Sequence, residues 1–156
     1  NLFIYFMTEW THATWNLFHC IPEKIKEEEF VHLRNDIIHY IKGICNRLPC
    51  PECAVHAGIF MNNVNTNNIR TSEELKKVMF IFHNNVNKKT KKQIQNEGVL
   101  EQYKNLKFHT VLNEFFSTFN SSTKGNFTFM SENFNRKIFT DTLIVFMKKN
   151  IHRFNN

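Results

Sequence analysis

A stripe of apolar side chains between residues 27 and 49 constrains the fold more than any other feature. Its members recur at spacings of three and four residues, which places them on one face of a helix that begins near Glu27 and ends near Pro49. Glycine and proline are scarce, with 4 and 3 residues among 156, and no stretch alternates as a strand does. We therefore predict an all-α fold. The residues of the stripe are Phe30, Leu33, Ile37, Ile41, Ile44 and Leu48.

Start and stop signals place the other helices. We expect a first helix over Thr8–His19, ended by Pro22, because proline disfavours helical geometry in the residue before it. Pro51 suits the first position of a third helix, and Thr71 with Glu74 forms a capping box for a fourth. Together these signals predict a four-helix bundle with additions at the C-terminus. The remaining predictions are a polar loop at 62–70, a fifth helix over 97–119, a turn-rich break at 120–126 and a last helix over 131–149.

The charge of the chain narrows the classes of partner. Lys and Arg number 20 against 14 for Asp and Glu, and much of the excess lies in the run Lys88–Lys92. A short local cluster favours a phosphate group or an acidic partner over duplex nucleic acid, which binds whole basic faces. The apolar run at residues 1–7 is much shorter than the ~20 residues that span a bilayer, so we expect a soluble protein without a membrane span.

The four cysteines include one closely spaced pair, Cys50 and Cys53. Four cysteines are too few for a disulfide scaffold in a chain of this length, so the pair indicates chemistry. At the N-terminus of a helix, the helix dipole stabilises a thiolate, which is the species that attacks disulfides. The same pair could supply half of a zinc site, together with His56 and a remote fourth ligand. Taken alone, the motif leaves both a redox role and a zinc role open.

The C-terminal part of the predicted fourth helix carries polar groups at helical spacing. His83 and Asn87 are four residues apart, and so are Lys88 and Lys92, so each pair shares one helical face while Val86 faces apolar material. This arrangement suits a ligand with a flat aromatic end and a phosphate end. It suits equally a capped helix end with a hydrogen-bonded histidine.

An aromatic residue and an imidazole also share a face of the first helix. Trp15 and His19 are four residues apart, so the two rings lie close enough to stack on a planar ligand. The alternative is that Trp15 belongs to the core and that His19 is a buried polar residue. The spacing alone does not choose between them.

These three groups occur in a fixed order along the chain, each on its own predicted helix. They read Trp15–His19, then Cys50–Cys53, then His83-Asn84-Asn85-Val86-Asn87 continuing to Lys92. In this order they resemble the Erv/ALR family of FAD-linked sulfhydryl oxidases, and the compact form with FHNNVN is most similar to those of large DNA viruses. The resemblance implies a four-helix bundle with a short fifth helix that binds FAD, over residues 8–105. Residues 106–156 lie outside the resemblance, and we predict that they form a C-terminal helical extension.

The resemblance also implies roles for individual residues. Cys53 would be the cysteine next to the flavin, and Cys50 the interchange cysteine that accepts electrons from a substrate thiol through a mixed disulfide. Electrons would then pass to FAD and to O₂, giving H₂O₂. The residues that would bind FAD are Trp15, His19, His83 and Asn87, supported by Asn84 and Val86, with Lys92 and Lys88 at the phosphate or ribose side and Tyr103 over the adenine.

Longer members of that family carry a second pair of cysteines on a flexible arm, which shuttles electrons. Only Cys20 and Cys45 remain here. They could form a structural disulfide between the first two helices or be free, buried thiols, and of these two arrangements we favour the free thiols. A thioredoxin-like partner would then deliver electrons straight to Cys50. The family implies a homodimer, located in the cytoplasm of an infected cell or in a virion, with the mitochondrial intermembrane space as the alternative. The Phe-rich faces of the extension are expected to enlarge the dimer contact or to pack back on the bundle.

Two other classes of function compete with the oxidase. A non-catalytic zinc-binding helical module would use Cys50, Cys53 and His56, but the chain offers no second Cys-x-x-Cys pair to complete the site. A helical protein that binds RNA or DNA would use the run Lys88–Lys92. Arginines are few, however, and no aromatic-lined sheet is predicted, so we expect no nucleic-acid partner.

Overall fold

A computed structural model describes residues 2–120 and 127–156 of the chain, and it describes side chains at 9–120 and 131–156. Within these ranges the fold is all-α, as predicted, and a single bridge between Ile25 and Phe154 is the only strand-like pairing. No helix in these ranges combines the length and the apolarity that crossing a bilayer requires. The α-helices are α1 (Leu2–Lys24), α2 (Glu27–Cys45), α3 (Pro51–Asn63), α4 (Ser72–Lys89), α5 (Phe108–Phe119) and α6 (Phe127–Asn150), and the short 3₁₀ helices are η1 (Thr66–Asn68), η2 (Glu97–Asn105) and η3 (Ile151–Arg153).

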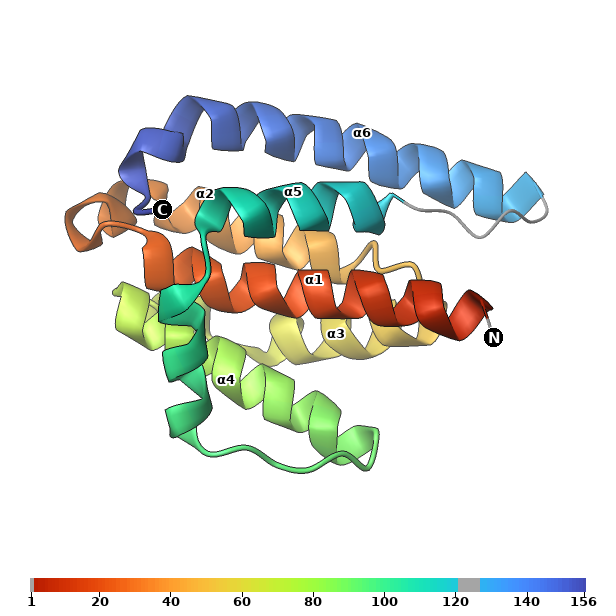
Figure 1. Cartoon of the computed structure of the whole chain (residues 1–156), viewed down its shortest axis with the longest axis horizontal. Coiled ribbons are helices and arrows are strands. Elements are labelled where there is room, and N and C mark those ends of the chain that lie inside the picture. Colours follow the sequence, from red (N-terminus) through yellow and green to blue (C-terminus); the bar gives the residue numbers. More distant parts are fainter. Residues whose placement is uncertain (1, 121–126) are drawn as a thin grey trace.

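Helix α1 runs through the middle of the molecule (Figure 1). In this view α5 and then α6 lie on one side of α1, while α3 and α4 lie on the other side. The short helix η2 crosses the direction of the long helices and connects the α4 side to the α5 side. Buried apolar side chains from all these layers form one continuous core. This arrangement places α1, α3, α4 and η2 around a common region, which holds most of the predicted site residues.

The apolar stripe of α2 and the capping box of α4 are confirmed, but α2 ends at Cys45 and not near Pro49. The stripe from Phe30 to Ile44 is buried, and Leu48 packs against the core. At the start of α4 the Thr71 hydroxyl accepts a hydrogen bond from the Glu74 N–H at 3.2 Å, and the Glu74 carboxylate accepts one from the Thr71 N–H at 3.0 Å. This reciprocal pair satisfies two N–H groups that a helix start otherwise leaves free.

The prediction that Pro22 ends the first helix is wrong, because α1 continues past it. Proline lacks an N–H, but the Ile25 N–H donates to the Ile21 carbonyl at 3.1 Å and closes the turn around the proline. Just beyond the helix, the Lys26 N–H donates to the Arg153 carbonyl at 3.0 Å. The end of α1 is therefore fixed by the far end of the chain, which local spacing does not predict.

The predicted single helix over 97–119 is also wrong. The segment forms η2 and α5, with an extended backbone at Leu106 and Lys107 between them. The two helices differ in direction (Figure 1), so Tyr103 and Phe108 reach the core from two different elements. In a 3₁₀ helix the side chains repeat every three residues. The spacing of 3.6 residues per turn, on which the single helix was predicted, therefore does not continue through this segment.

The C-terminal extension packs back on the bundle, which was one of its two predicted arrangements. Phe115, Phe119 and Phe139 are buried, and the Phe139 ring lies against α2 at Gly43, where a Cβ would come within 2.3 Å of it. Because only glycine leaves this space, α2 and α6 can approach closely. The Asn120 amide donates to the Thr140 hydroxyl at 2.9 Å and joins α5 to α6. Of the predicted break at 120–126, all but Asn120 lies outside the described residues.

Candidate functional site

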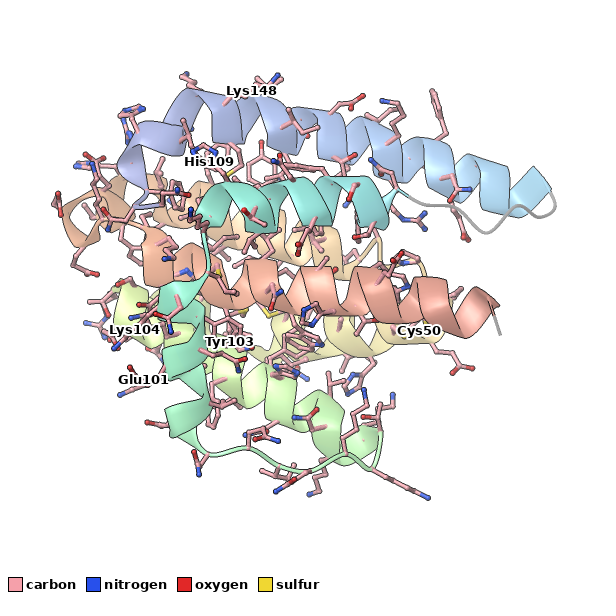
Figure 2. All side chains as sticks on the ribbon, viewed as in Figure 1. Cys50, Glu101, Tyr103, Lys104, His109 and Lys148 are labelled. Carbon is pink, nitrogen blue, oxygen red and sulfur yellow. A yellow bond between two sulfur atoms is a disulfide. The ribbon has the colours of Figure 1, made fainter. Side chains whose placement is uncertain are left out.

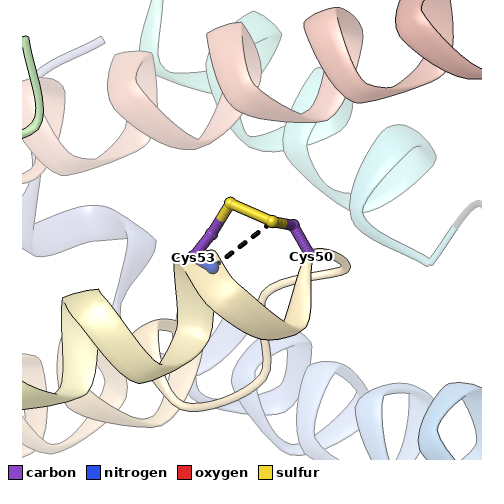
Figure 3. Close-up of a disulfide and its surroundings, with 2 residues drawn as sticks. All are labelled: Cys50 and Cys53. Atoms are coloured by element: carbon purple, nitrogen blue, oxygen red, sulfur yellow. Dashed lines mark hydrogen bonds between the residues drawn. A yellow bond between two sulfur atoms is a disulfide. The ribbon is translucent and has the colours of Figure 1, made fainter. Parts of the chain in front are cut away.

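Cys50 and Cys53 form a disulfide at the N-terminus of α3 (Figure 3). Cys50 is the N-cap residue, and its sulfur accepts a hydrogen bond from the Cys53 N–H at 3.3 Å. Pro51 occupies the first helical position, as predicted, where its missing N–H costs no hydrogen bond. Both cysteines are partly exposed. When the disulfide opens, the N–H groups and the dipole of α3 stabilise negative charge on these sulfurs.

Four aromatic and imidazole rings from α1, α4 and η2 stack on one another. The planes of the Trp15 and His83 rings are nearly parallel, with an angle of 3° between them, and the ring centroids are 3.9 Å apart. The His19 ring stacks on Tyr103 at 4.5 Å, and His19 Nε2 lies 2.8 Å from His83 Nδ1. Figure 2 shows Tyr103 on η2, beside α1. The structure thus brings together Trp15, His19, His83 and Tyr103, which are far apart in the sequence.

Burial keeps both imidazoles of this stack neutral. It lowers the pKa of His19 to about 3, with a smaller effect in the same direction from His83. It also lowers the pKa of His83 to about 4, and the positive charge of Lys92 adds to that shift. Near pH 7 the short contact between them is therefore a hydrogen bond between two neutral rings, one donating and one accepting. The stack offers flat, uncharged faces with a cation at its edge.

A series of ring contacts extends this stack to the face of α3 that carries the disulfide. The Trp15 ring lies 5.0 Å from Phe82, and Phe82 stacks on Phe60 of α3 at 4.6 Å. Phe60 follows Cys53 by seven residues, about two helical turns, so both side chains lie on the same face of α3. In Figure 3 the sulfur atoms project from α3 on the side of α1. We call the contacts Phe60–Phe82–Trp15–His83–His19–Tyr103 the ring series.

The predicted asparagines hold the loop after α4 rather than forming part of the stack. The Asn84 amide donates to the Gln95 carbonyl at 2.8 Å and accepts from the Gln95 N–H at 3.0 Å. Asn87, which is buried, donates to Asn84 at 3.3 Å and accepts from the Lys92 N–H through its own carbonyl at 2.8 Å. Gln95 was missed by sequence reasoning, since a contact across eleven residues has no helical spacing to reveal it.

The other predicted residues of this segment lie around the stack. Val86 packs against the core. Lys88 is exposed in the last turn of α4, and Lys92 is exposed in the loop, close enough to affect the pKa of His83. Thr90 caps the helix and donates to the Val86 carbonyl at 2.8 Å.

A buried lysine fixes η2, and with it Tyr103, against α1. The Lys24 ammonium is 7% exposed and donates to the Lys104 carbonyl at 2.9 Å. Burial raises the pKa of the neighbouring Tyr103 hydroxyl to about 12, with a smaller contribution from Cys20. Tyr103 is therefore a neutral phenol at physiological pH. Lys24 was not singled out from the sequence, because a lysine near a helix end is usually solvated.

The other two cysteines are free and buried, as predicted. Burial raises the pKa of each thiol, Cys20 and Cys45, to about 12, so neither is a thiolate at neutral pH. Because the thiolate is the species that exchanges with disulfides, burial suppresses exchange by these two cysteines in the folded chain.

The zinc alternative finds no support in this arrangement. The disulfide removes the two thiolates that a zinc ion would need from Cys50 and Cys53. Among the described residues, no three or more His, Cys, Asp or Glu side chains are grouped so that they could hold a metal ion. His56 is partly exposed, and its pKa is lowered by burial and by Lys89, against a hydrogen bond from Asn85.

The fold is an all-α bundle with a disulfide at the N-terminus of α3, and the helical face that carries the disulfide leads to a stack of neutral rings. These features are typical of a thiol–disulfide redox protein. The chain belongs to the Erv1 / Alr family, whose profile matches residues 12–105. An FAD-linked sulfhydryl oxidase from the Malawi isolate of African swine fever virus is 28% identical over 107 residues, which is 69% of this chain and 87% of the relative.

Other viral relatives are about equally similar. An FAD-linked sulfhydryl oxidase from the Kenyan isolate of African swine fever virus is 27% identical over 106 residues, 68% of this chain and 86% of the relative. The putative FAD-linked sulfhydryl oxidase 096R of Invertebrate iridescent virus 3 is 27% identical over 97 residues, 61% of this chain and 66% of the relative. No solved structure shows significant similarity to this chain.

Proposed function

We propose that this protein is an FAD-dependent thiol oxidase that makes disulfides in other proteins. Membership of the Erv1 / Alr family and the names of the viral relatives support a flavin-linked enzyme of this kind. One observation carries the proposal in the structure itself. The partly exposed disulfide of Cys50 and Cys53 shares a face of α3 with Phe60, where the ring series begins.

The disulfide accepts electrons by thiol exchange. A substrate thiolate attacks the Cys50 sulfur, the Cys50–Cys53 bond breaks, and Cys53 leaves as a thiolate at the positive end of α3. A second substrate thiolate attacks the mixed disulfide, which releases the oxidised substrate and returns Cys50 as a thiolate. Two substrate thiols have then become one disulfide, their two protons have passed to solvent, and the enzyme pair is reduced.

The ring series fits the flat parts of FAD. Within it, the rings of Trp15, His83, His19 and Tyr103 stack on one another. Burial keeps His19 and His83 neutral, so an uncharged planar ring system matches this stack. Trp15 and His83 would contact the isoalloxazine, with Asn87 held by Asn84 beside them. Bound FAD would supply the two-electron acceptor that side chains lack, with O₂ as the final acceptor and H₂O₂ as the product.

The remaining cofactor contacts lie at the edges of the stack. Lys92 and Lys88 would hold the phosphate or ribose part of FAD, because both side chains are exposed. Lys92 is near enough to the stack to affect the pKa of His83, and Lys88 lies in the last turn of α4. Tyr103 would contact the adenine from η2, where Lys24 fixes it. The functional unit in this proposal is residues 8–105, with 106–156 as an extension.

We infer that a partner protein delivers the electrons. The free cysteines, Cys20 and Cys45, are buried and protonated, so they do not serve as a shuttle pair. A thioredoxin-like protein, whose exposed dithiol has a thiolate at neutral pH, is a suitable donor to Cys50. The named relatives are viral proteins, which supports a viral protein acting in infected-cell cytoplasm or in the virion. That it acts as a homodimer is part of this proposal and follows from the family resemblance alone.

The visible absorption spectrum of the purified protein tests the proposal. We expect a flavin spectrum that bleaches when dithiothreitol is added without oxygen and returns in air, with one H₂O₂ formed per disulfide. The Cys53→Ser variant should keep the flavin spectrum and lose the rapid bleaching, because its flavin has no thiolate donor. A wild-type protein that stays colourless after refolding with FAD would contradict the proposal.

A further inference from the structure

A groove lies between α6 and the segment that leads into Cys50. Its volume is about 850 Å³, within the roughly 300–1,000 Å³ that is typical of ligand sites. The sequence did not reveal it, because its two walls are about ninety residues apart in the chain. The lining comes from the start of the α2–α3 connection, from the first turn of α3 and from one side of α6, and consists of Asn46, Arg47, Leu48, Pro51, Ala54, Glu132, Asn135, Arg136, Ile138, Phe139 and Thr142.

The groove adjoins the disulfide. Pro51 and Ala54 line it, and they directly follow Cys50 and Cys53 in the chain. Consecutive residues of an α-helix are about 100° apart around its axis, so the groove lies roughly a quarter-turn around α3 from the disulfide. A chain segment in the groove therefore passes the N-terminal end of α3, where Cys50 is partly exposed.

The two walls of the groove are fixed to each other. Arg136 is 5% exposed, and its guanidinium donates to the Arg47 carbonyl at 2.8 Å and to the Asn133 side chain at 2.7 Å. The Arg47 guanidinium lies over the Phe139 ring, 4.4 Å from its centroid. A cation of α6 thus holds the chain three residues before Cys50, so the groove is formed before any ligand binds.

The lining chemistry matches an extended polypeptide segment. Asn46 and Asn135 are exposed amides on opposite walls, and amides both donate to and accept from a peptide backbone. On the α6 wall, Ile138 leaves half of its surface uncovered, which suits an apolar side chain. A smaller hollow of about 310 Å³ shares Asn46 and Ala54 with the groove and continues the surface along α3.

Two apolar side chains of that hollow are also uncovered. Val55 and Ile59 are 64% and 58% exposed, on the outer face of the helix that carries the disulfide. Exposed apolar surface next to a reactive centre is typical of a binding surface. The polar walls and the apolar strip together extend further than a small dithiol needs, and they suit a run of several residues.

We propose that this groove docks an extended, cysteine-bearing segment of the protein that reduces Cys50. The proposal rests on the oxidase function, and adds the place and form of substrate recognition and a task for α6. Docking brings the thiolate of the segment to the Cys50 sulfur, where it forms a mixed disulfide as Cys53 leaves. A thiol too small to fill the groove reacts without this help.

Paired variants of α6 test the proposal. Ile138→Arg puts a charged side chain into the groove at a half-exposed position, and Val145→Arg puts the same charge at a position that is 67% exposed and outside the groove lining. The measured quantity is kcat/KM for reduced, unfolded ribonuclease A divided by kcat/KM for dithiothreitol. We expect this ratio to fall about fivefold or more in Ile138→Arg, the effect of losing roughly one buried apolar contact, and to stay unchanged in Val145→Arg.

A second measurement needs no flavin. In the Cys53→Ser chain, the Cys50 thiolate attacks a peptide–thionitrobenzoate disulfide, forms a mixed disulfide with the peptide and releases coloured thionitrobenzoate. Adding Ile138→Arg should slow this reaction several-fold relative to the reaction with free dithiobis(nitrobenzoate). Because FAD takes no part, this assay decides on the groove even if the wild-type protein proves colourless and the oxidase proposal fails.

Two results would overturn the docking proposal. One is that, in both assays, Ile138→Arg leaves the ratio of the rate with the protein or peptide substrate to the rate with the small reagent unchanged. That result would show that no substrate segment binds productively in the groove. The other is an unchanged ratio together with conversion of a dimer to a monomer in Ile138→Arg, measured by sedimentation. That outcome would make the groove a contact between two copies of this chain.

Discussion

His19 Nε2 and His83 Nδ1 lie 2.8 Å apart, and each ring is also stacked, His19 on Tyr103 and His83 on Trp15. A hydrogen bond at this distance needs one nitrogen with a proton and one without. If both rings were protonated, two cations would face each other in a buried stack. The two neutral imidazoles therefore belong to the folded state and link α1 to α4.

This pair predicts that stability falls in mildly acidic solution. Burial lowers the pKa of His19 to about 3 and that of His83 to about 4, from an unfolded value of about 6.5. Between these values the unfolded chain binds more protons, so stability from the neutral rings is complete above about pH 6.5 and is lost as pH falls towards the folded values. Thermal unfolding of the flavin-free chain should show a melting temperature that drops from pH 7 to about pH 4.

Two histidine variants test this prediction. His19→Gln removes one buried titrating group, so its melting temperature should depend less steeply on pH than that of the wild type. His32 is exposed, and His32→Gln should leave the slope unchanged. Equal slopes for wild type and His19→Gln would show that this pair does not govern the acid sensitivity.

The sequence predicted the parts of the fold that local patterns encode. The stripe of α2 and the capping box of α4 depend on spacings of three and four residues, and both are confirmed. The end of α1 and the division between η2 and α5 depend on contacts between distant residues, such as the bond from the Lys26 N–H to the Arg153 carbonyl. No local spacing carries that information, so both boundaries were wrong.

The same distinction applies to the site. Trp15, His19 and His83 were selected by spacing and by resemblance, and the structure brings them together with Tyr103. Gln95 was missed because it takes part through its backbone N–H and carbonyl, which the Asn84 side chain binds. Arg136 was missed because its side chain holds the carbonyl of Arg47, which is distant in the sequence. A polar side chain with such a task looks, in the sequence, like any solvated residue.

The stack predicts which side chains retain the cofactor. His83→Ala removes one ring and one hydrogen bond from the ring series, and we expect FAD affinity to fall about tenfold or more, equivalent to about 1.4 kcal/mol. His32→Ala, on the exposed side of α2, should leave the affinity unchanged. Quenching of flavin fluorescence on titration with the flavin-free protein measures both. Equal affinities would exclude His83 from the binding site.

The contact between Gly43 and Phe139 predicts a large effect from a single methyl group. In Gly43→Ala the new Cβ would lie 2.3 Å from a rigid ring carbon, so α6 must shift, at a cost of about 1–3 kcal/mol in unfolding free energy. In Gly58→Ala the new Cβ meets the Asn46 side-chain oxygen at 2.9 Å, and that exposed side chain can move away. The second variant should be neutral or stabilised by about 0.5–1 kcal/mol.

Urea unfolding of both glycine variants measures the difference. If α6 packs on α2 as described, the double variant Gly43→Ala with Phe139→Leu should lose less stability than the sum of the two single variants, because the two changes relieve the same contact. Strict additivity would show that the two residues do not touch in solution.

The four cysteines should divide into two reactivity classes. After reduction, Cys50 and Cys53 are partly exposed at a helix N-terminus, whereas Cys20 and Cys45 are buried thiols whose pKa is raised to about 12. Because iodoacetamide reacts with thiolates, the native reduced protein should gain two adducts quickly, and the other two only after unfolding. Mass spectrometry of the alkylated peptides identifies the sites. Rapid labelling of Cys20 in the folded chain would mean that α1 opens near Tyr103.

The same division predicts the activity of a chain without the two buried cysteines. A Cys20→Ser/Cys45→Ser chain should still oxidise dithiothreitol at the wild-type rate.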